Sequence, residues 1–170
     1  MPLDKSFKKN LPKHVAFIMD GNRRWAKKKK LKIIDGHKKG SEVVRNIVKK
    51  SLELEIKYLT FFSFSTENWN RSRDEILNLQ TLLNLYLDSE EERFIQKKIK
   101  FSFIGDIEKF DKKIKKKLNN LKLITKSFKK LNFTLALSYG SRNEIVDAIN
   151  KVKKKKNYID ESDITKHLMT

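Results

Sequence analysis

The chain alternates short apolar runs with longer segments whose apolar residues recur at helical spacing. Four runs are rich in β-forming residues and bounded by polar ones, which is typical of buried strands. These runs are 14–20, 58–64, 99–104 and 133–139. Four further segments place apolar residues three and four positions apart, as amphipathic helices do. These segments are 40–55, 73–88, 110–128 and 142–153. The alternation favours an α/β fold with a mainly parallel central sheet flanked by helices.

Length and composition predict one domain without a membrane-spanning helix. The 170 residues suffice for one hydrophobic core, and no segment rich in Pro, Gly or Ser divides them, so we predict a single domain over 1–170. No run reaches the length of about 18 apolar residues that a transmembrane helix needs. Residues 1–5 hold no apolar signal segment and the chain has no cysteine. We therefore predict a cytoplasmic protein without disulfides or thiolate metal sites.

The chain is strongly basic, with 40 Lys and Arg against 21 Asp and Glu and a formal net charge of +19. This charge favours polyanionic partners: nucleic acid, an anionic membrane surface or phosphorylated small molecules. Lysines dispersed over solvated faces would give the same total without a specific partner. The charge alone leaves these alternatives open.

The first polar cluster follows the first predicted strand directly. It reads Asp20-Gly21-Asn22-Arg23-Arg24-Trp25, and Gly36-His37 follows shortly after. A carboxylate can hold a metal ion, while arginines and the free amides of a helix start can hold phosphate. The alternative is an ordinary helix cap formed by Asp20. A cap alone requires neither the two arginines nor the Trp, so the cluster favours a metal–diphosphate site.

A second cluster, Ser63-Phe64-Ser65-Thr66-Glu67-Asn68-Trp69-Asn70-Arg71, ends the second predicted strand. Parallel strands bring their carboxyl ends to one edge of the sheet, so both clusters are expected to meet in one cleft. The alternative is a loop that caps the next helix through Ser72. Weaker clusters occur at 104–106 and 138–143. The apolar helices 40–55 and 73–88 are expected to line a cleft for an amphiphilic substrate, although ordinary core packing explains them too.

These clusters resemble, in order and spacing, the motifs of the cis-prenyltransferase family, the isoprenyl diphosphate synthases that include undecaprenyl diphosphate synthase. The segments that carry the resemblance are HVAFIMDGNRRWA (14–26), GHKKG (36–40), FSTENWNR (64–71), IGD (104–106) and YGSR (139–142). They extend over nearly the whole chain, and the first and third together are highly specific to the family.

The resemblance implies a reaction and a set of residues. Family members condense isopentenyl diphosphate with an allylic diphosphate such as farnesyl diphosphate, and repeated condensation with loss of a proton builds a cis-polyprenyl lipid carrier. The resemblance assigns Mg²⁺ binding and diphosphate departure to Asp20, and proton removal to Asn68. The residues it assigns to the substrates are Gly21, Asn22, Arg23, Arg24, Trp25, His37, Ser65, Thr66, Glu67, Trp69 and Arg71.

Two features depart from the family pattern. Members usually carry an Arg shortly before the Gly-His pair, where this chain has Ile33, and the neighbouring Lys32 lacks the bidentate fork of Arg. Members also continue for some tens of residues, with an Arg-rich motif for isopentenyl diphosphate, a Glu that shares the metal and much of the surface of a homodimer. The resemblance thus implies a C-terminally truncated domain, a homodimer at full length and little turnover by residues 1–170 alone.

Two alternatives to this enzyme remain. The chain could be a non-catalytic remnant or partner with the same fold, or a basic module that binds nucleic acid. Dispersed lysines and the absence of a known nucleic-acid-binding motif weigh against the second alternative, so no nucleic-acid partner is expected.

Overall fold

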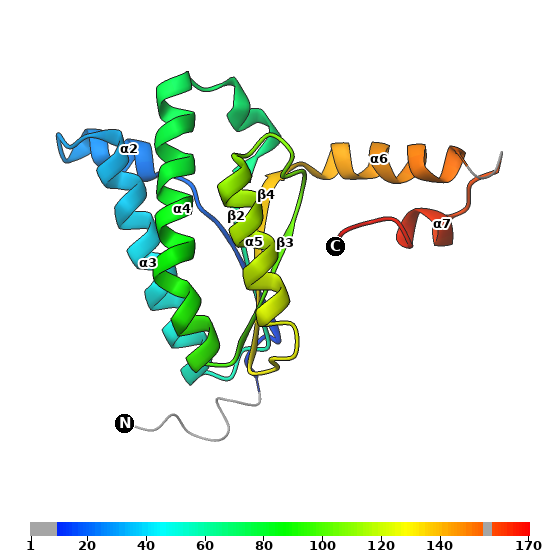
Figure 1. Cartoon of the computed structure of the whole chain (residues 1–170), viewed down its shortest axis with the longest axis horizontal. Helices are drawn as coiled ribbons and strands as arrows, with labels where there is room; N and C mark the ends of the chain where they lie inside the picture. The colour runs from blue at the N-terminus through cyan, green and yellow to red at the C-terminus, as the bar shows by residue number, and fades with distance from the viewer. Residues whose placement is uncertain (1–9, 155–157) are drawn as a thin grey trace.

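A computed structural model describes residues 10–154 and 158–170 (Figure 1). The strands are β1 (His14–Ile18), β2 (Tyr58–Ser65), β3 (Ile99–Ile104) and β4 (Leu131–Tyr139). They form one sheet in the order β1, β2, β4, β3, and every neighbouring pair is parallel. The predicted parallel sheet is confirmed. The prediction that residues 1–5 hold no signal segment lies outside the described residues.

Helices connect the strands and follow the last one. They are α2 (Asn22–Lys28), α3 (Ile33–Glu53), the 3-10 helix η1 (Thr66–Asn70), α4 (Arg73–Gln96), α5 (Lys112–Ile124), α6 (Ser141–Lys153) and α7 (Glu161–Thr165). Helix α3 begins at Ile33, before the predicted start at 40, and Gly36 lies inside it at the contact with α2. Helix α4 runs beyond the predicted end at 88, since its charged last turns still bury Glu90 and Phe94.

Helices α3, α4 and α5 cover one face of the sheet, and the core lies between the two layers (Figure 1). Phe133 occupies its centre, with ring centroids of Phe61 and Phe94 at 5.4 and 5.1 Å. On the opposite face the alternate β1 residues are exposed, and Ile18 retains 77% of its accessible surface. In this part of the sheet, the described helices therefore cover one face and leave the other exposed.

Helix α6 starts directly after β4 and projects away from the sheet, with α7 beside it (Figure 1). The buried carboxylate of Glu144 in α6 accepts hydrogen bonds from Tyr139 Oη (2.6 Å) and from the backbone N–H of Met169. These bonds hold the end of the described chain against the start of α6.

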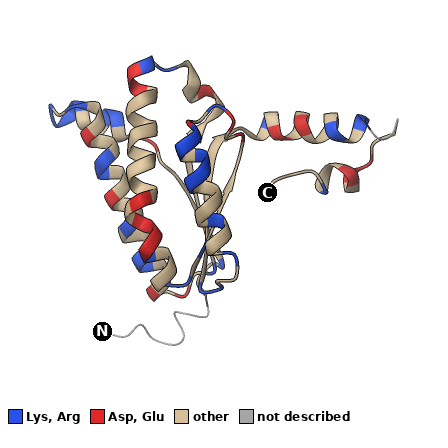
Figure 2. Cartoon of the chain, in the orientation of Figure 1, with Lys and Arg blue, Asp and Glu red and all other residues tan. Residues whose placement is uncertain are grey.

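Basic residues are spread over several elements rather than collected on one (Figure 2). Lys and Arg lie on α2, α3, α5 and α6, whereas acidic residues gather on the second half of α4. Lys117 of α5 reaches Asp88 of α4 at 2.6 Å. Part of the positive charge is therefore paired within the protein. Within the described ranges, no helix has the length and apolar content needed to cross a membrane.

Candidate functional site

The first polar cluster forms the turn between β1 and α2. Gly21 adopts a φ of 87°, a conformation that glycine tolerates at little cost, and it precedes the first residue of α2. The Asp20 carboxylate accepts hydrogen bonds from Gly21 N (2.5 Å) and Arg24 Nη2 (2.8 Å). Its side chain is 73% exposed. The carboxylate therefore faces solvent beside the amino end of α2.

Two glycines of α3 allow α2 to approach closely. A Cβ at Gly36 would lie 2.2 Å from the carbonyl oxygen of Asn22, and one at Gly40 would lie 2.9 Å from Asn22 Oδ1. Any side chain at Gly36 would collide with backbone, so the contact requires glycine there. Gly36 and His37 form one motif in the sequence. The structure shows that glycine is needed in this motif because α2 packs against it.

The second cluster forms η1 and its flanks. A capping box closes this turn: Asn68 Oδ1 accepts from the Ser65 amide at 3.1 Å, and the Ser65 side chain accepts from the backbone of Asn68. Hydrogen bonds, first from its own backbone and then from Ser65, lower the pKa of the exposed Glu67 carboxyl. The polar groups of the turn therefore contribute to its order.

Glu75 of α4 joins the two clusters. Its carboxylate lies 2.9 Å from Arg71 Nη1 and 3.6 Å from Arg23 Nη1, and its side chain is only 10% exposed. One carboxylate thus holds a guanidinium from each cluster. Sequence analysis did not single out Glu75, which resembles any acidic residue in the first turn of a helix.

A cavity between α3 and α4 collects residues from both clusters. One end is polar and includes Asn22, His37, Asn68 and Arg71. The remainder is mostly apolar and is lined by Val44, Phe64, Leu79, Leu82, Leu83, Tyr86, Phe110, Leu135 and Leu137. The predicted convergence of the two clusters is therefore present in the structure. The cavity therefore suits an amphiphilic ligand.

The Nε2 atom of His37 is buried and has no hydrogen-bond partner. No other buried side-chain nitrogen or oxygen among the described residues lacks one. Burial, and next the positive charge of Arg71, lower the pKa of the imidazole, while Glu75 opposes this shift. The ring is thus neutral near pH 7, with one nitrogen left unpartnered. A buried polar atom in this position is available to bond a ligand.

The other predicted site residues lie outside this cavity lining. Asp20, Gly21, Arg23, Arg24, Trp25, Ser65, Glu67, Thr66 and Trp69 are not among the residues that line it. Thr66 and Trp69 instead line a second hollow with Asp106, Tyr139 and Gly140. Trp25 is 39% exposed on α2.

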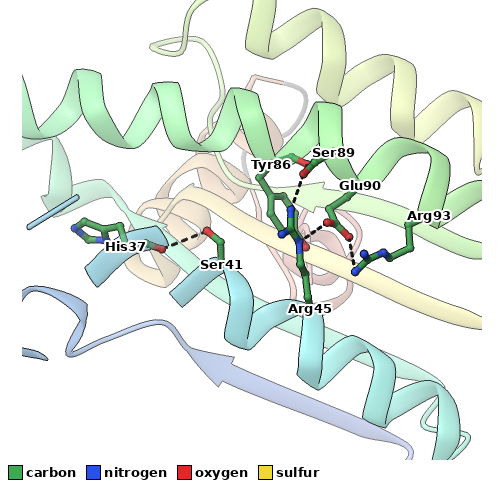
Figure 3. A network of polar contacts seen from close by, with 7 residues as sticks. All are labelled: His37, Ser41, Arg45, Tyr86, Ser89, Glu90 and Arg93. Carbon is green, nitrogen blue, oxygen red and sulfur yellow. Dashed lines mark hydrogen bonds and ion pairs between the residues drawn. The ribbon is translucent and has the colours of Figure 1, made fainter. Parts of the chain in front are cut away.

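A polar network joins α3 to α4 beyond the apolar part of the cavity (Figure 3). Arg45 donates from Nε to Glu90 Oε1 (2.6 Å) and from Nη2 to Ser89 Oγ (2.8 Å), and Arg93 approaches Glu90 at 3.5 Å. Burial, and then the charge of Glu90, raise the pKa of the Tyr86 phenol, which lines the cavity. The network therefore ties the two helices together one turn beyond Tyr86.

The described residues do not contain a cluster of three or more His, Asp or Glu side chains that could hold a metal ion. Asp20 offers a single exposed carboxylate. Mg²⁺ in proteins is commonly held by one or two carboxylates together with phosphate oxygens and water. The donor set therefore fits a Mg²⁺ ion that arrives with a diphosphate better than a metal held by the protein alone.

Comparisons with known proteins relate the chain to one family. The Prenyltransf family model, which describes undecaprenyl diphosphate synthase, matches residues 18–170. The chain is 42% identical to an isoprenyl transferase of Fusobacterium nucleatum, covering 94% of this chain and 70% of that protein. It is 45% identical to an isoprenyl transferase of Thermotoga maritima, and the match covers 85% of this chain and 62% of that protein. The fold is similar to the crystal structure of lavandulyl diphosphate synthase from Lavandula x intermedia in complex with dimethylallyl diphosphate. The TM-score is 0.87 at 32% sequence identity, and the match covers 93% of this chain and 71% of that chain.

Proposed function

Because the chain belongs to the undecaprenyl diphosphate synthase family of prenyltransferases, we propose that it binds an allylic diphosphate and condenses it with isopentenyl diphosphate into a cis-polyprenyl diphosphate. The chain spans 62 to 70% of the length of these two curated relatives. The observation that carries the proposal is the cavity between α3 and α4, which is polar at one end and mostly apolar along the rest. The dimethylallyl diphosphate bound to the lavandulyl enzyme supports a ligand of this class.

The polar end supplies groups suited to a diphosphate. Arg71 and Asn22 line it, and Arg23 shares Glu75 with Arg71. A guanidinium binds phosphate through paired charge-assisted hydrogen bonds. The Nε2 of a neutral His37 would donate to a phosphate oxygen and would thereby gain the partner that it lacks. Arg24, Trp25 and the Gly21 turn would act from the solvent side.

The apolar part suits a prenyl chain. Leu79, Leu83 and Tyr86 of α4 face Val44 of α3 along it. Such a lining excludes water from the allylic carbon, where positive charge develops as the diphosphate departs with the electron pair of its C–O bond. The double bond of isopentenyl diphosphate then forms the new C–C bond, and loss of a proton completes the condensation. By resemblance, Asn68 assists the proton loss.

We assign Mg²⁺ binding to Asp20. When bound, the ion would neutralise charge on the departing diphosphate. Arg24, which pairs with Asp20 at 2.8 Å, would then be free to contact phosphate.

Binding of farnesyl diphosphate tests the proposal. We expect the 170-residue chain to bind it in isothermal titration, more tightly than either farnesol or pyrophosphate. Arg71→Ala is expected to weaken binding about tenfold or more, the scale of one charge-assisted contact. Lys39→Ala is the control, because Lys39 lies on α3 and pairs with Glu42 outside the cavity. Binding no tighter than that of pyrophosphate, or unchanged in Arg71→Ala, would contradict the proposal.

Incorporation of labelled isopentenyl diphosphate tests the reaction itself. Asp20→Ala is expected to abolish product formation and the Mg²⁺-dependent part of farnesyl diphosphate binding. Product formation that persists in this variant would refute the role of Asp20. The homodimer, the cytoplasmic location and a peripheral contact with anionic membrane stay predictions. The comparisons give no support to the nucleic-acid-binding alternative.

A further inference from the structure

Ser138 has an unusual backbone conformation inside β4. Its φ is 50°, in the left-handed region that residues other than glycine rarely adopt. Pairing between β2 and β4 is irregular here: Phe64 faces Leu137 and Ser65 faces Tyr139, so Ser138 is the extra residue of a bulge. Bulges of this kind redirect a side chain and often lie beside functional sites. The strain persists only where neighbouring structure maintains it.

The redirected hydroxyl holds Trp69 of η1. Trp69 Nε1 donates to Ser138 Oγ at 2.9 Å. The indole ring packs against Phe64 and Phe110, with ring centroids at 4.8 and 5.1 Å. Because η1 also carries Asn68 and is followed by Arg71, one bond joins β4 to the turn that supplies two cavity residues.

The backbone of Ser138 is held from the other side by the end of β3. Asp106 N donates to the Ser138 carbonyl at 3.2 Å. A Cβ at Gly105, whose φ is 103°, would lie 2.1 Å from the carbonyl oxygen of Leu137. The turn after β3 therefore packs directly on the bulge, and Ser138 is only 4% exposed.

We propose that Ser138 is a positioning residue for the diphosphate site. Its bulge, braced by the 105–106 turn, aims the hydroxyl at Trp69, and the anchored indole orders η1 so that Asn68 and Arg71 face the cavity. This inference rests on the proposed function, since it deepens the account of the same site. It assigns Ser138 no contact with substrate.

The indole N–H of Trp69 reports the anchor directly. The chain contains two tryptophans, so its NMR spectrum has two indole N–H signals, and Trp25→Phe identifies that of Trp69. We expect Ser138→Ala and Ser138→Gly to shift the Trp69 signal and to speed its hydrogen exchange about tenfold or more. The backbone amides of residues 66–71 should exchange faster as well.

Two further variants separate the hydroxyl from general stability. Ser138→Asn should restore slow exchange, because Asn tolerates the left-handed conformation and its side-chain oxygen accepts a hydrogen bond. Ser138→Gly relieves the strain but lacks the acceptor, so recovery in this variant would show that strain alone matters. Ser102→Ala is the matched control, since the Ser102 hydroxyl in β3 bonds Thr134 at 2.8 Å, whereas Trp69 Nε1 bonds Ser138.

Affinity for farnesyl diphosphate tests the consequence. Ser138→Ala should weaken binding about fivefold, the factor for one net hydrogen bond, and Ser138→Asn should recover it. Unchanged exchange at Trp69 and 66–71 in Ser138→Ala would overturn the proposal, and so would altered exchange with unchanged affinity. If the unmodified chain does not bind farnesyl diphosphate, the proposed function fails, whereas the exchange data still decide whether Ser138 orders η1.

Discussion

Removing Arg45 should destabilise the protein more than removing the charge of its partner, Glu90. The two residues form the pair that ties α3 to α4, with a 2.6 Å distance between Arg45 Nε and Glu90 Oε1. The side chain of Glu90 is 4% exposed, whereas that of Arg45 is 37% exposed. The variants Arg45→Met and Glu90→Gln keep much of each side chain's shape while deleting one charge.

The difference in exposure sets the magnitudes. Breaking a fully buried ion pair costs about 3–5 kcal/mol, and an exposed pair contributes about 0–1 kcal/mol. Arg45→Met strands a carboxylate that water does not reach, although Arg93 at 3.5 Å compensates in part. We expect a loss of about 2–3 kcal/mol in the free energy of unfolding. Glu90→Gln leaves a guanidinium that can turn toward water, so we expect a loss of about 1 kcal/mol.

Urea unfolding followed by circular dichroism measures both losses. In thermal unfolding, the melting temperature should fall by about 6 °C in Arg45→Met and by about 3 °C in Glu90→Gln. Lys39→Met is the control on the same helix, because the Lys39–Glu42 pair is more than half exposed on both sides and should contribute little. Equal losses in the two network variants, or a larger loss in Glu90→Gln, would refute the reasoning from solvent access.

Two further predictions concern the helix that begins at Ile33. Gly36→Ala should lower the free energy of unfolding by about 2 kcal/mol despite its higher helix propensity, because the added Cβ meets the Asn22 carbonyl. An unchanged urea midpoint would contradict the close contact of α2 with α3. Because burial and then Arg71 lower the pKa of His37 from 6.5, the unfolded chain binds more protons than the folded chain just below that pH. The stability of the unmodified protein should therefore fall, relative to His37→Gln, as the pH drops below about 6.5, and parallel pH profiles of the two melting temperatures would rule this out.

The sheet and the meeting of the two polar clusters could be predicted because both follow from local pattern. Short β-rich runs fix the strands, and parallel strands place their carboxyl ends together, so Asn22 and Asn68 arrive at one cavity. The start of α3 could not be read in the same way. Gly36 resembles a helix breaker in sequence, but the approach of α2 makes glycine necessary inside the helix.

The tertiary contacts between segments could not be predicted from the sequence pattern. Glu75 and Glu90 resemble ordinary helix-surface acids, yet tertiary packing leaves their side chains 10% and 4% exposed. Ser138 gives no local signal of a left-handed backbone, because the bulge arises from a register shift between β2 and β4. Such features depend on which surfaces meet, and a single sequence does not encode that visibly.

The order of the strands constrains how the protein can be synthesised. β4 is the last of the described strands to leave the ribosome, yet it lies between β2 and β3 and is the sole partner of β3 within the described sheet. Until residues 131–139 emerge, the Phe-rich edge of β2 and the whole of β3 have no strand to pair with. Exposed apolar edges of this kind promote aggregation of nascent chains. In a chain whose synthesis pauses before β4, only β1 and β2 can pair. Folding of this protein is therefore expected to need chaperone protection until β4 has emerged.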